Sequence, residues 1–209
     1  MKNYKHLIFI LFLTIHIVAQ ENTNSQIEND SLKKLATNNE NPISEHLTFR
    51  EIPIDGSIKN FAKQLEKQKF KIEDITDVDA VLTVRFTGEL VKLLVKGRKE
   101  TVGNVRVIFS ERTNWIESKT KYNYVKKSLT EKYGEPKRVI EEFIEPFKDG
   151  SGDEIKALKE GKCKYRSDFV TNSKNGILTL EINADLSVSI LYVDSANYKK
   201  LKEQAMKEY

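Results

Sequence analysis

Cysteine, proline, glycine and histidine are all scarce in this chain of 209 residues, which holds one Cys, four Pro, nine Gly and three His. A single cysteine excludes a disulfide framework and a metal site built from several thiolates. So few glycines and prolines exclude a collagen-like or Pro-rich low-complexity protein. The remaining composition, 39% hydrophobic and 32% charged, is typical of a globular protein.

Residues 1–19 predict a signal peptide. Lys2 and Lys5 precede an apolar run from Leu7 to Val18, and Ala19 follows it. The run is about a dozen residues long, shorter than the roughly 20 that a membrane-spanning helix needs. We therefore expect cleavage after Ala19, with an uncleaved anchor as the alternative, and membrane contact only through this segment. The protein is then exported to the periplasm, the outer membrane or the medium, and no cysteine lies nearby to carry a lipid.

Removing this segment leaves a nearly neutral chain. The full chain has 35 Lys and Arg against 31 Asp and Glu, and two of the lysines lie in residues 1–19. The mature chain therefore carries 33 basic and 31 acidic residues, a net charge of +2. Because nucleic-acid binding rests on many phosphate contacts, this small charge and the expected export predict no nucleic-acid partner.

Residues 20–45 predict a flexible polar linker, because they are rich in Asn and Gln and contain no aromatic residue. Dense apolar patterning begins at Leu47 and continues to the C-terminus. The predicted folded region is therefore 46–209. A region of that size buries enough surface to fold without a metal or a disulfide.

Hydrophobic spacing predicts helices and strands along this region. Ser57 is a suitable N-cap for a helix over 57–68, and a second helix begins at Trp115 and ends at Gly134. A stripe through Tyr198, Leu201, Ala205 and Tyr209 predicts a C-terminal helix. Alternation of apolar and polar residues predicts strands, with turns at Thr87-Gly88 and Lys96-Gly97, over 80–86, 89–95, 105–109, 137–144, 162–170, 176–183 and 186–193.

Two segments resemble each other at an offset of 83 residues. Val105–Trp115 aligns with Val188–Tyr198 without a gap, and seven of the eleven positions are identical or conservative. Each describes a buried strand that runs into a capped helix with an aromatic residue near its start. The second unit carries extra residues around 147–161, where 154–160 predicts a short helix. We therefore predict an α+β fold of two tandem repeats, 46–114 and 115–209, each a helix packed on an antiparallel sheet of three to four strands, plus a C-terminal helix.

Three short segments resemble a known group of sequences. The runs 46–56, 131–136 and 162–165 resemble an uncharacterised family of signal-peptide-bearing exported proteins of anaerobic Gram-negative bacteria, and the resemblance covers about 46–198. The repeat, a helix ending in Gly-x-Pro followed by antiparallel strands, is similar in fold to the outer-membrane-assembly lipoprotein BamE and to the β-lactamase inhibitor protein. This resemblance implies a fold and no catalytic residues. It also implies that a disulfide common in relatives is absent here, since Leu93 or a neighbour stands where they have a second cysteine.

The sequence predicts no catalytic, cofactor-binding or metal-binding residue, and therefore a protein that is not an enzyme. Beyond residues 1–19 the only histidine is His46, which we expect to be solvated at the start of a strand. One imidazole excludes hydrolytic triads and His-rich zinc sites. Gly-rich phosphate-binding motifs and the Gly-x-Ser-x-Gly motif do not occur. Paired carboxylates stay open as an enzymatic alternative, because their separation in space is not visible in a sequence.

Four oxygen-bearing side chains have the spacing of an EF-hand loop at its positions 1, 3, 5 and 12: Asp149, Ser151, Asp153 and Glu160. Because Glu154 stands where that loop needs glycine, we expect a solvated loop rather than a calcium site. Asp74, Asp77 and Asp79 predict an ordinary Asp-rich turn.

Cys163 alternates with Tyr165 and Phe169, which predicts a small buried core residue rather than a reactive thiol. Lysines at 119, 121, 126, 127, 199 and 200 lie on predicted helices. We expect them to form solvated polar faces.

These observations favour an exported, non-enzymatic protein that binds another protein of the cell envelope through a sheet face or the groove between the two repeats. The alternative is a carbohydrate- or lipid-binding accessory protein that uses exposed aromatic residues. A protein-binding face mixes apolar and charged groups, whereas a sugar platform needs two or three coplanar exposed rings.

Overall fold

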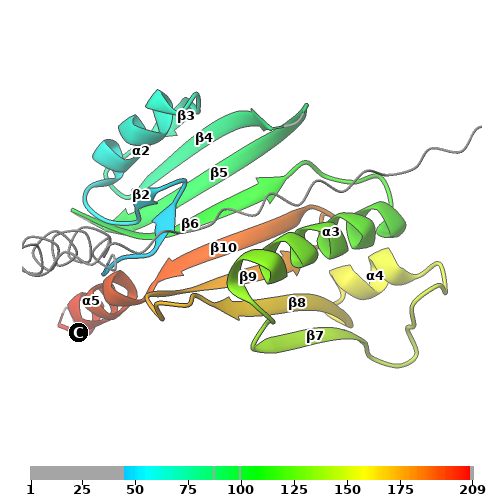
Figure 1. Ribbon diagram of the computed structural model, residues 1–209. Helices are drawn as coiled ribbons and strands as arrows, with labels where there is room; N and C mark the ends of the chain where they lie inside the picture. Colours follow the sequence, from blue (N-terminus) through cyan, green and yellow to red (C-terminus); the bar gives the residue numbers. More distant parts are fainter. Residues whose placement is uncertain (1–44, 87, 99, 208–209) are drawn as a thin grey trace, which may run out of the picture. The chain divides into compact units, whose positions relative to one another are not determined.

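An eight-stranded antiparallel sheet organises this protein, shown as a computed structural model that describes residues 45–86, 88–98 and 100–207 (Figure 1). The predicted signal peptide, and the predicted linker except for Glu45, lie outside the described residues. All of the described residues belong to one unit, Pro42–Tyr209. With four described helices, the fold is mixed α+β, as the sequence predicts at that level.

The sheet is built from hairpins in chain order, except at its centre. From one edge to the other its strands are β3 (Lys71–Ile75), β4 (Asp79–Phe86), β5 (Glu89–Arg98), β6 (Thr101–Phe109), β10 (Val188–Asp194), β9 (Gly176–Ile182), β8 (Cys163–Val170) and β7 (Arg138–Phe143). The central pair is β6 with β10, where Val107 lies opposite Ile190. A separate small hairpin contains β1 (Thr48–Phe49) and β2 (Ile52–Pro53).

The helices begin and end at residues whose chemistry explains the boundary. The described helices are α2 (Ile58–Lys67), α3 (Trp115–Tyr133), α4 (Glu154–Lys159) and α5 (Ser195–Met206). The Ser57 side chain accepts a hydrogen bond from the Asn60 N–H and caps α2, and Asn114 caps α3 in the same way through Glu117. Gly134 ends α3 at a φ of 81°, a conformation that favours glycine.

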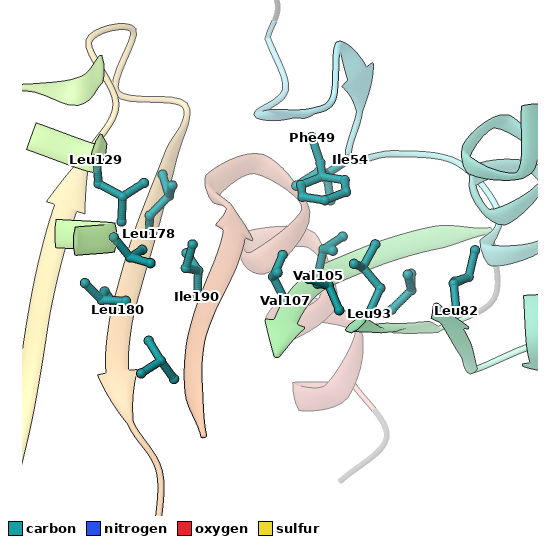
Figure 2. Packing of buried hydrophobic residues seen from close by; sticks show 14 of the residues in the cluster. Phe49, Ile54, Leu82, Leu93, Val105, Val107, Leu129, Leu178, Leu180 and Ile190 are labelled. Carbon is teal, nitrogen blue, oxygen red and sulfur yellow. The ribbon is translucent and has the colours of Figure 1, made fainter. Parts of the chain in front are cut away.

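Buried apolar side chains gather on one face of the sheet (Figure 2). Paired strands present Leu82, Leu93, Val107 and Ile190 to this face, and none of the four is more than 7% exposed. Helix α2 packs against β3–β6 and helix α3 against β8–β10, so this covered face lies under the helices. No helix in the described ranges combines the length and the apolar character needed to cross a bilayer.

Two sequence predictions fail in the first half of the sheet, one at a turn and one at a strand. The predicted turn at Lys96-Gly97 does not exist, because β5 continues to Arg98 through an irregularity in its pairing with β6. The Gly97 N–H donates to the Val78 carbonyl, and the Thr101 carbonyl oxygen lies 2.2 Å from the position a Cβ would take. Glycine is therefore needed here for close backbone approach rather than for a turn. Strand β3 was not predicted, because its sequence Lys-Ile-Glu-Asp-Ile is mostly charged.

The predicted C-terminal helix is present, but its predicted apolar stripe is wrong at Tyr198; Leu201 and Ala205 are partly buried, and Tyr209 lies outside the described residues. Tyr198 is 60% exposed, whereas Asn197 is buried. The cap of α5 is Asp194, whose side chain accepts from the Asn197 N–H at 2.8 Å. Asn197 therefore aligns with the α3 cap Asn114 in sequence but performs a different task.

Candidate functional site

The second face of the sheet is exposed along much of its area. Cross-strand partners share a face, so the residues between the buried ones in each strand define this surface. We call it the open sheet face. From β4 to β8 it comprises Asp79, Val81, Thr83, Arg85, Leu90, Lys92, Leu94, Lys96, Asn104, Arg106, Ile108, Ser189, Leu191, Val193, Ile177, Thr179, Glu181, Lys164, Arg166, Asp168 and Val170. Only Ser189 and Thr179 among them are buried.

An ion pair crosses the centre of the open sheet face. Arg106 Nη1 on β6 lies 2.6 Å from Glu181 Oε1 on β9 and 3.2 Å from Ser189 Oγ on β10. Both charged side chains are about one-third exposed or less, at 31% and 27%. These contacts link side chains of three neighbouring strands and restrain the position of the guanidinium.

A second polar cluster lies next to it on β8 and β9. Arg166 Nε donates to Asp168 Oδ1 at 2.9 Å, and the Thr179 hydroxyl donates to the same oxygen at 2.8 Å. Ion pairs of this kind, open to solvent on one side, contribute little to stability, roughly 0–1 kcal/mol each. Their main effect is to order charged groups on an accessible surface.

The open sheet face carries more basic than acidic side chains, interleaved with aliphatic ones. The basic residues are Arg85, Lys92, Lys96, Arg106, Lys164 and Arg166, and the acidic ones are Asp79, Asp168 and Glu181. Leu94, Ile108 and Leu191 lie between them and are partly exposed. The surface can therefore offer apolar contact and a positive potential together.

The sequence prediction for His46 is wrong. Its side chain is 22% exposed, and Nδ1 lies 3.1 Å from Oδ1 of Asp194, a carboxylate with no exposed area. Its Nε2 lies 3.6 Å from Asp55 Oδ2, and the Asn175 amide donates to the His46 carbonyl at 2.9 Å. The sequence could not reveal these contacts, because Asp194 lies 148 residues from His46 and Asn175 lies 129 residues from it.

Asp194 joins the start of the folded region to its last helix. Oδ2 accepts a hydrogen bond from the Leu47 N–H at 2.6 Å, while Oδ1 caps α5. The buried Asn197 amide donates to the carbonyls of Ile54 and Val102 at 2.8 and 3.1 Å. Each of these contacts holds a backbone group in place. We call the residues that make them, His46, Asp194 and Asn197, the Asp194 cluster, and its role is structural.

Asp55 extends the Asp194 cluster through its contacts with His46 and Asn197. Partial burial opposes its ionisation, but the Gly56 N–H, the Asn197 amide and the nearby His46 outweigh this and hold the pKa of Asp55 below its usual value. We therefore expect this carboxylate to stay ionised and to keep accepting hydrogen bonds at neutral pH.

The EF-hand-like spacing does not gather its four side chains on one point. Asp149 accepts from Trp115 Nε1 at 2.9 Å and is paired with Lys119, whereas Asp153 precedes α4 and Glu160 follows it. The Lys119 and Trp115 hydrogen bonds hold the pKa of Asp149 below its usual value. Among the described residues no group of three His, Cys, Asp or Glu side chains is placed to hold a metal ion.

The three aspartates of the predicted turn lie around the β3–β4 connection, with Asp74 near the end of β3 and Asp79 at the start of β4. The Ile75 N–H donates to Asp74 Oδ1, the Thr76 hydroxyl donates to Asp79 Oδ1, and Asp77 pairs with Lys59. These side chains satisfy backbone and neighbouring groups, as Asp-rich turns ordinarily do.

Three of the helix lysines are less exposed than the sequence suggests. Lys119 pairs with Asp149, Lys121 with Glu89 and Lys126 with Glu141. Lys121 is 18% exposed, and its ammonium lies 4.2 Å from the centroid of the Phe109 ring. Helical spacing placed these residues on the polar side of α3 but could not show that acidic residues of other elements reach that side.

Cys163 is buried, as predicted, on the covered face with Tyr165 and Phe169. Burial raises the pKa of its thiol to about 12, and the carboxylates of Asp149 and Glu154 add to this effect.

Cys163 is therefore expected to be inert in the folded protein. At pH 8 a thiol of that pKa is ionised in about one molecule in ten thousand, and the thiolate is the reactive form. Labelling with a chromogenic disulfide reagent should be roughly 1,000-fold slower in buffer than in denaturing urea. Equal rates in both conditions would show that the thiol is accessible and would contradict the burial.

The basic and aliphatic residues of the open sheet face were not singled out from sequence. The alternation Asn104, Arg106, Ile108 and Lys164, Arg166, Asp168 was visible as a signal. What the sequence does not show is that β6 and β8 turn these residues to the same face.

Comparisons of the chain with known protein families, with curated proteins and with solved structures gave no match.

Proposed function

We propose that this chain is an exported, non-enzymatic protein-binding module of the cell envelope, which binds an acidic partner protein through the open sheet face. The observation that carries the proposal is the composition of that face, where basic side chains alternate with partly exposed aliphatic ones on a hydrogen-bonded sheet. Electrostatic complementarity steers a partner of opposite charge, and the apolar groups supply contact area. The predicted signal peptide supports the export.

A protein partner fits this face better than a carbohydrate. The described strands place no aromatic side chain on the open sheet face. A sugar platform needs coplanar exposed rings, whereas protein contacts use mixed aliphatic and charged groups.

The test is site-specific photo-crosslinking of the natively exported protein. A photoreactive amino acid at Leu94 lies on the open sheet face, and one at Tyr124, which is 67% exposed on α3, is the matched control elsewhere. We expect one acidic envelope protein to be captured from position 94 and not from position 124. Capture of the same products from both positions, or from 124 alone, would contradict the proposal.

Charge reversal on the open sheet face should weaken this interaction. Lys92 and Lys96 are exposed on β5, and replacing both by glutamate is expected to reduce affinity about tenfold or more, since each close charge contact contributes roughly 1 kcal/mol in water. Quantitative crosslinking at increasing salt measures the change.

The matched control is the double variant Lys63→Glu and Lys67→Glu on the exposed side of α2, which changes net charge equally. Equal loss in both double variants would mean that overall charge, and not this face, controls binding. That result would remove the open sheet face from the proposal.

We also propose that the two halves of the chain are tandem repeats. Each half is a helix followed by four strands, α2 with β3–β6 and α3 with β7–β10. The sequence offset of 83 relates Val107 to Ile190, and these two residues pair directly at the centre of the sheet. The same offset relates Arg106 to Ser189 and Ile108 to Leu191. It therefore converts the cross-strand pair Arg106–Leu191 into the cross-strand pair Ile108–Ser189. A local twofold axis through the central pair therefore accounts for both the sequence match and the register.

A further inference from the structure

An apolar groove lies on the covered face of the sheet, at its centre. It is open to solvent and has a volume of about 160 Å³. Val91, Val107 and Ile190 line it from three neighbouring strands, and Phe49 lines it from the β1–β2 hairpin. Figure 2 shows Phe49 on the same side of the sheet as Val107, with Ile190 beside Val107 on the next strand.

The groove is accessible although it belongs to the core side of the sheet. Phe86 lines it and is 53% exposed, whereas Phe70 and Phe49 are buried at its wall. An apolar cavity of this size is large enough for a benzene-sized group, about six carbon atoms. Arg50 is the one charged side chain in the lining.

Arg50 is placed to recognise an anion at the edge of the groove. Its guanidinium carbon lies 5.9 Å from the Phe70 ring centroid and 6.0 Å from that of Phe86, and the side chain is exposed. At the Phe109 end, Lys121 and Arg112 both pair with Glu89, which leaves an excess of positive charge there as well. The lining is therefore apolar except for Arg50, and a second basic group, Lys121, lies against the Phe109 ring.

We propose that this groove binds a single-chain anionic amphiphile, a free fatty carboxylate, with its hydrocarbon tail over Val107 and its carboxylate on Arg50. The cavity volume sets the tail length at about six to seven carbons. The guanidinium matches a carboxylate in geometry and charge. This inference is independent of the open sheet face, because the two surfaces lie on opposite faces of the sheet.

The test is a titration of the purified full chain with octanoate, octanol and octylammonium, followed by methyl NMR. Octanoate is expected to shift the methyl signals of Val91, Val107 and Ile190 in a saturable way and to leave those of Leu94, on the opposite face, unchanged. Each methylene from butanoate to octanoate should strengthen binding about threefold, with no further gain in longer chains. Octylammonium should bind at least tenfold more weakly than octanoate.

Arg50→Asp tests the charge without disturbing the core. Arg50 has a φ of 52°, a conformation that aspartate tolerates, and its side chain is exposed. We expect this variant to lose the preference for octanoate over octylammonium. Lys69→Asp is the matched control, because Lys69 is also exposed, has a φ of 71° and does not line the groove.

Three outcomes would overturn the proposal. Absence of saturable shifts at millimolar octanoate would show that the groove is not a ligand site. Equal affinity for octanoate, octanol and octylammonium would show that no anion is recognised. Equal effects of Arg50→Asp and Lys69→Asp would show that Arg50 does not contact the carboxylate.

Discussion

Replacing Trp115 by alanine is expected to lower the free energy of unfolding by about 3–5 kcal/mol. The Trp115 side chain is 5% exposed, and its ring meets those of Tyr165 and Phe143 edge to face, at centroid separations of 5.0 and 5.7 Å. Its Nε1 also donates to Asp149. Alanine removes the ring from between α3 and the sheet and leaves a cavity. Urea unfolding followed by far-ultraviolet circular dichroism measures the loss.

Two variants separate packing from other effects at this position. Trp115→Phe keeps most of the ring contact and loses the hydrogen bond, so it is expected to cost about 1–2 kcal/mol. Tyr124→Ala removes an exposed ring from the same helix and should stay within about 0.5 kcal/mol of the parent protein. If Trp115→Ala costs no more than Tyr124→Ala, the aromatic cluster does not stabilise the docking of α3.

Replacing Asp194 by alanine is expected to cost about 3 kcal/mol, because it removes a helix cap and also leaves the buried Leu47 N–H without its acceptor. His46 loses its carboxylate partner at the same time. Thermal unfolding of the parent and the variant at neutral pH measures the difference.

Asn114→Ala is the matched control for the lost cap. Asn114 caps α3 through one backbone N–H, as Asp194 caps α5, but Asn114 is exposed. Its replacement is expected to cost about 1 kcal/mol. An equal cost for Asp194→Ala would show that the contacts of Asp194 with Leu47 and His46 contribute nothing.

Local chemistry explains why most helices and strands were predictable. Ser57, Asn114 and Gly134 mark helix ends through backbone geometry that depends only on near neighbours. The strands β4, β8 and β9 alternate strongly enough to be recognised one at a time. The short helix predicted over 154–160 is also present, as α4 between β7 and β8.

Long-range partners explain what was not predictable. His46 looks like a solvated residue in sequence, and its environment is set by Asp194 and Asn175 far along the chain. The central pairing of β6 with β10 likewise decides which side chains face outward together. For the same reason the open sheet face and the groove beside Arg50 became visible only in three dimensions.

The central pairing also has a consequence for the order in which the chain folds. The other strand pairs of the sheet join strands that are consecutive in the chain. Most of their connections are short, and the longest, between β7 and β8, contains α4. The β6–β10 ladder and the Leu47–Asp194 hydrogen bond instead join residues up to 147 positions apart. Contacts of such sequence separation form slowly, and we expect them to complete folding last. When the chain is synthesised or exported from its N-terminus onward, the eight-stranded sheet therefore cannot form completely until β10, the last strand in the sequence, is available.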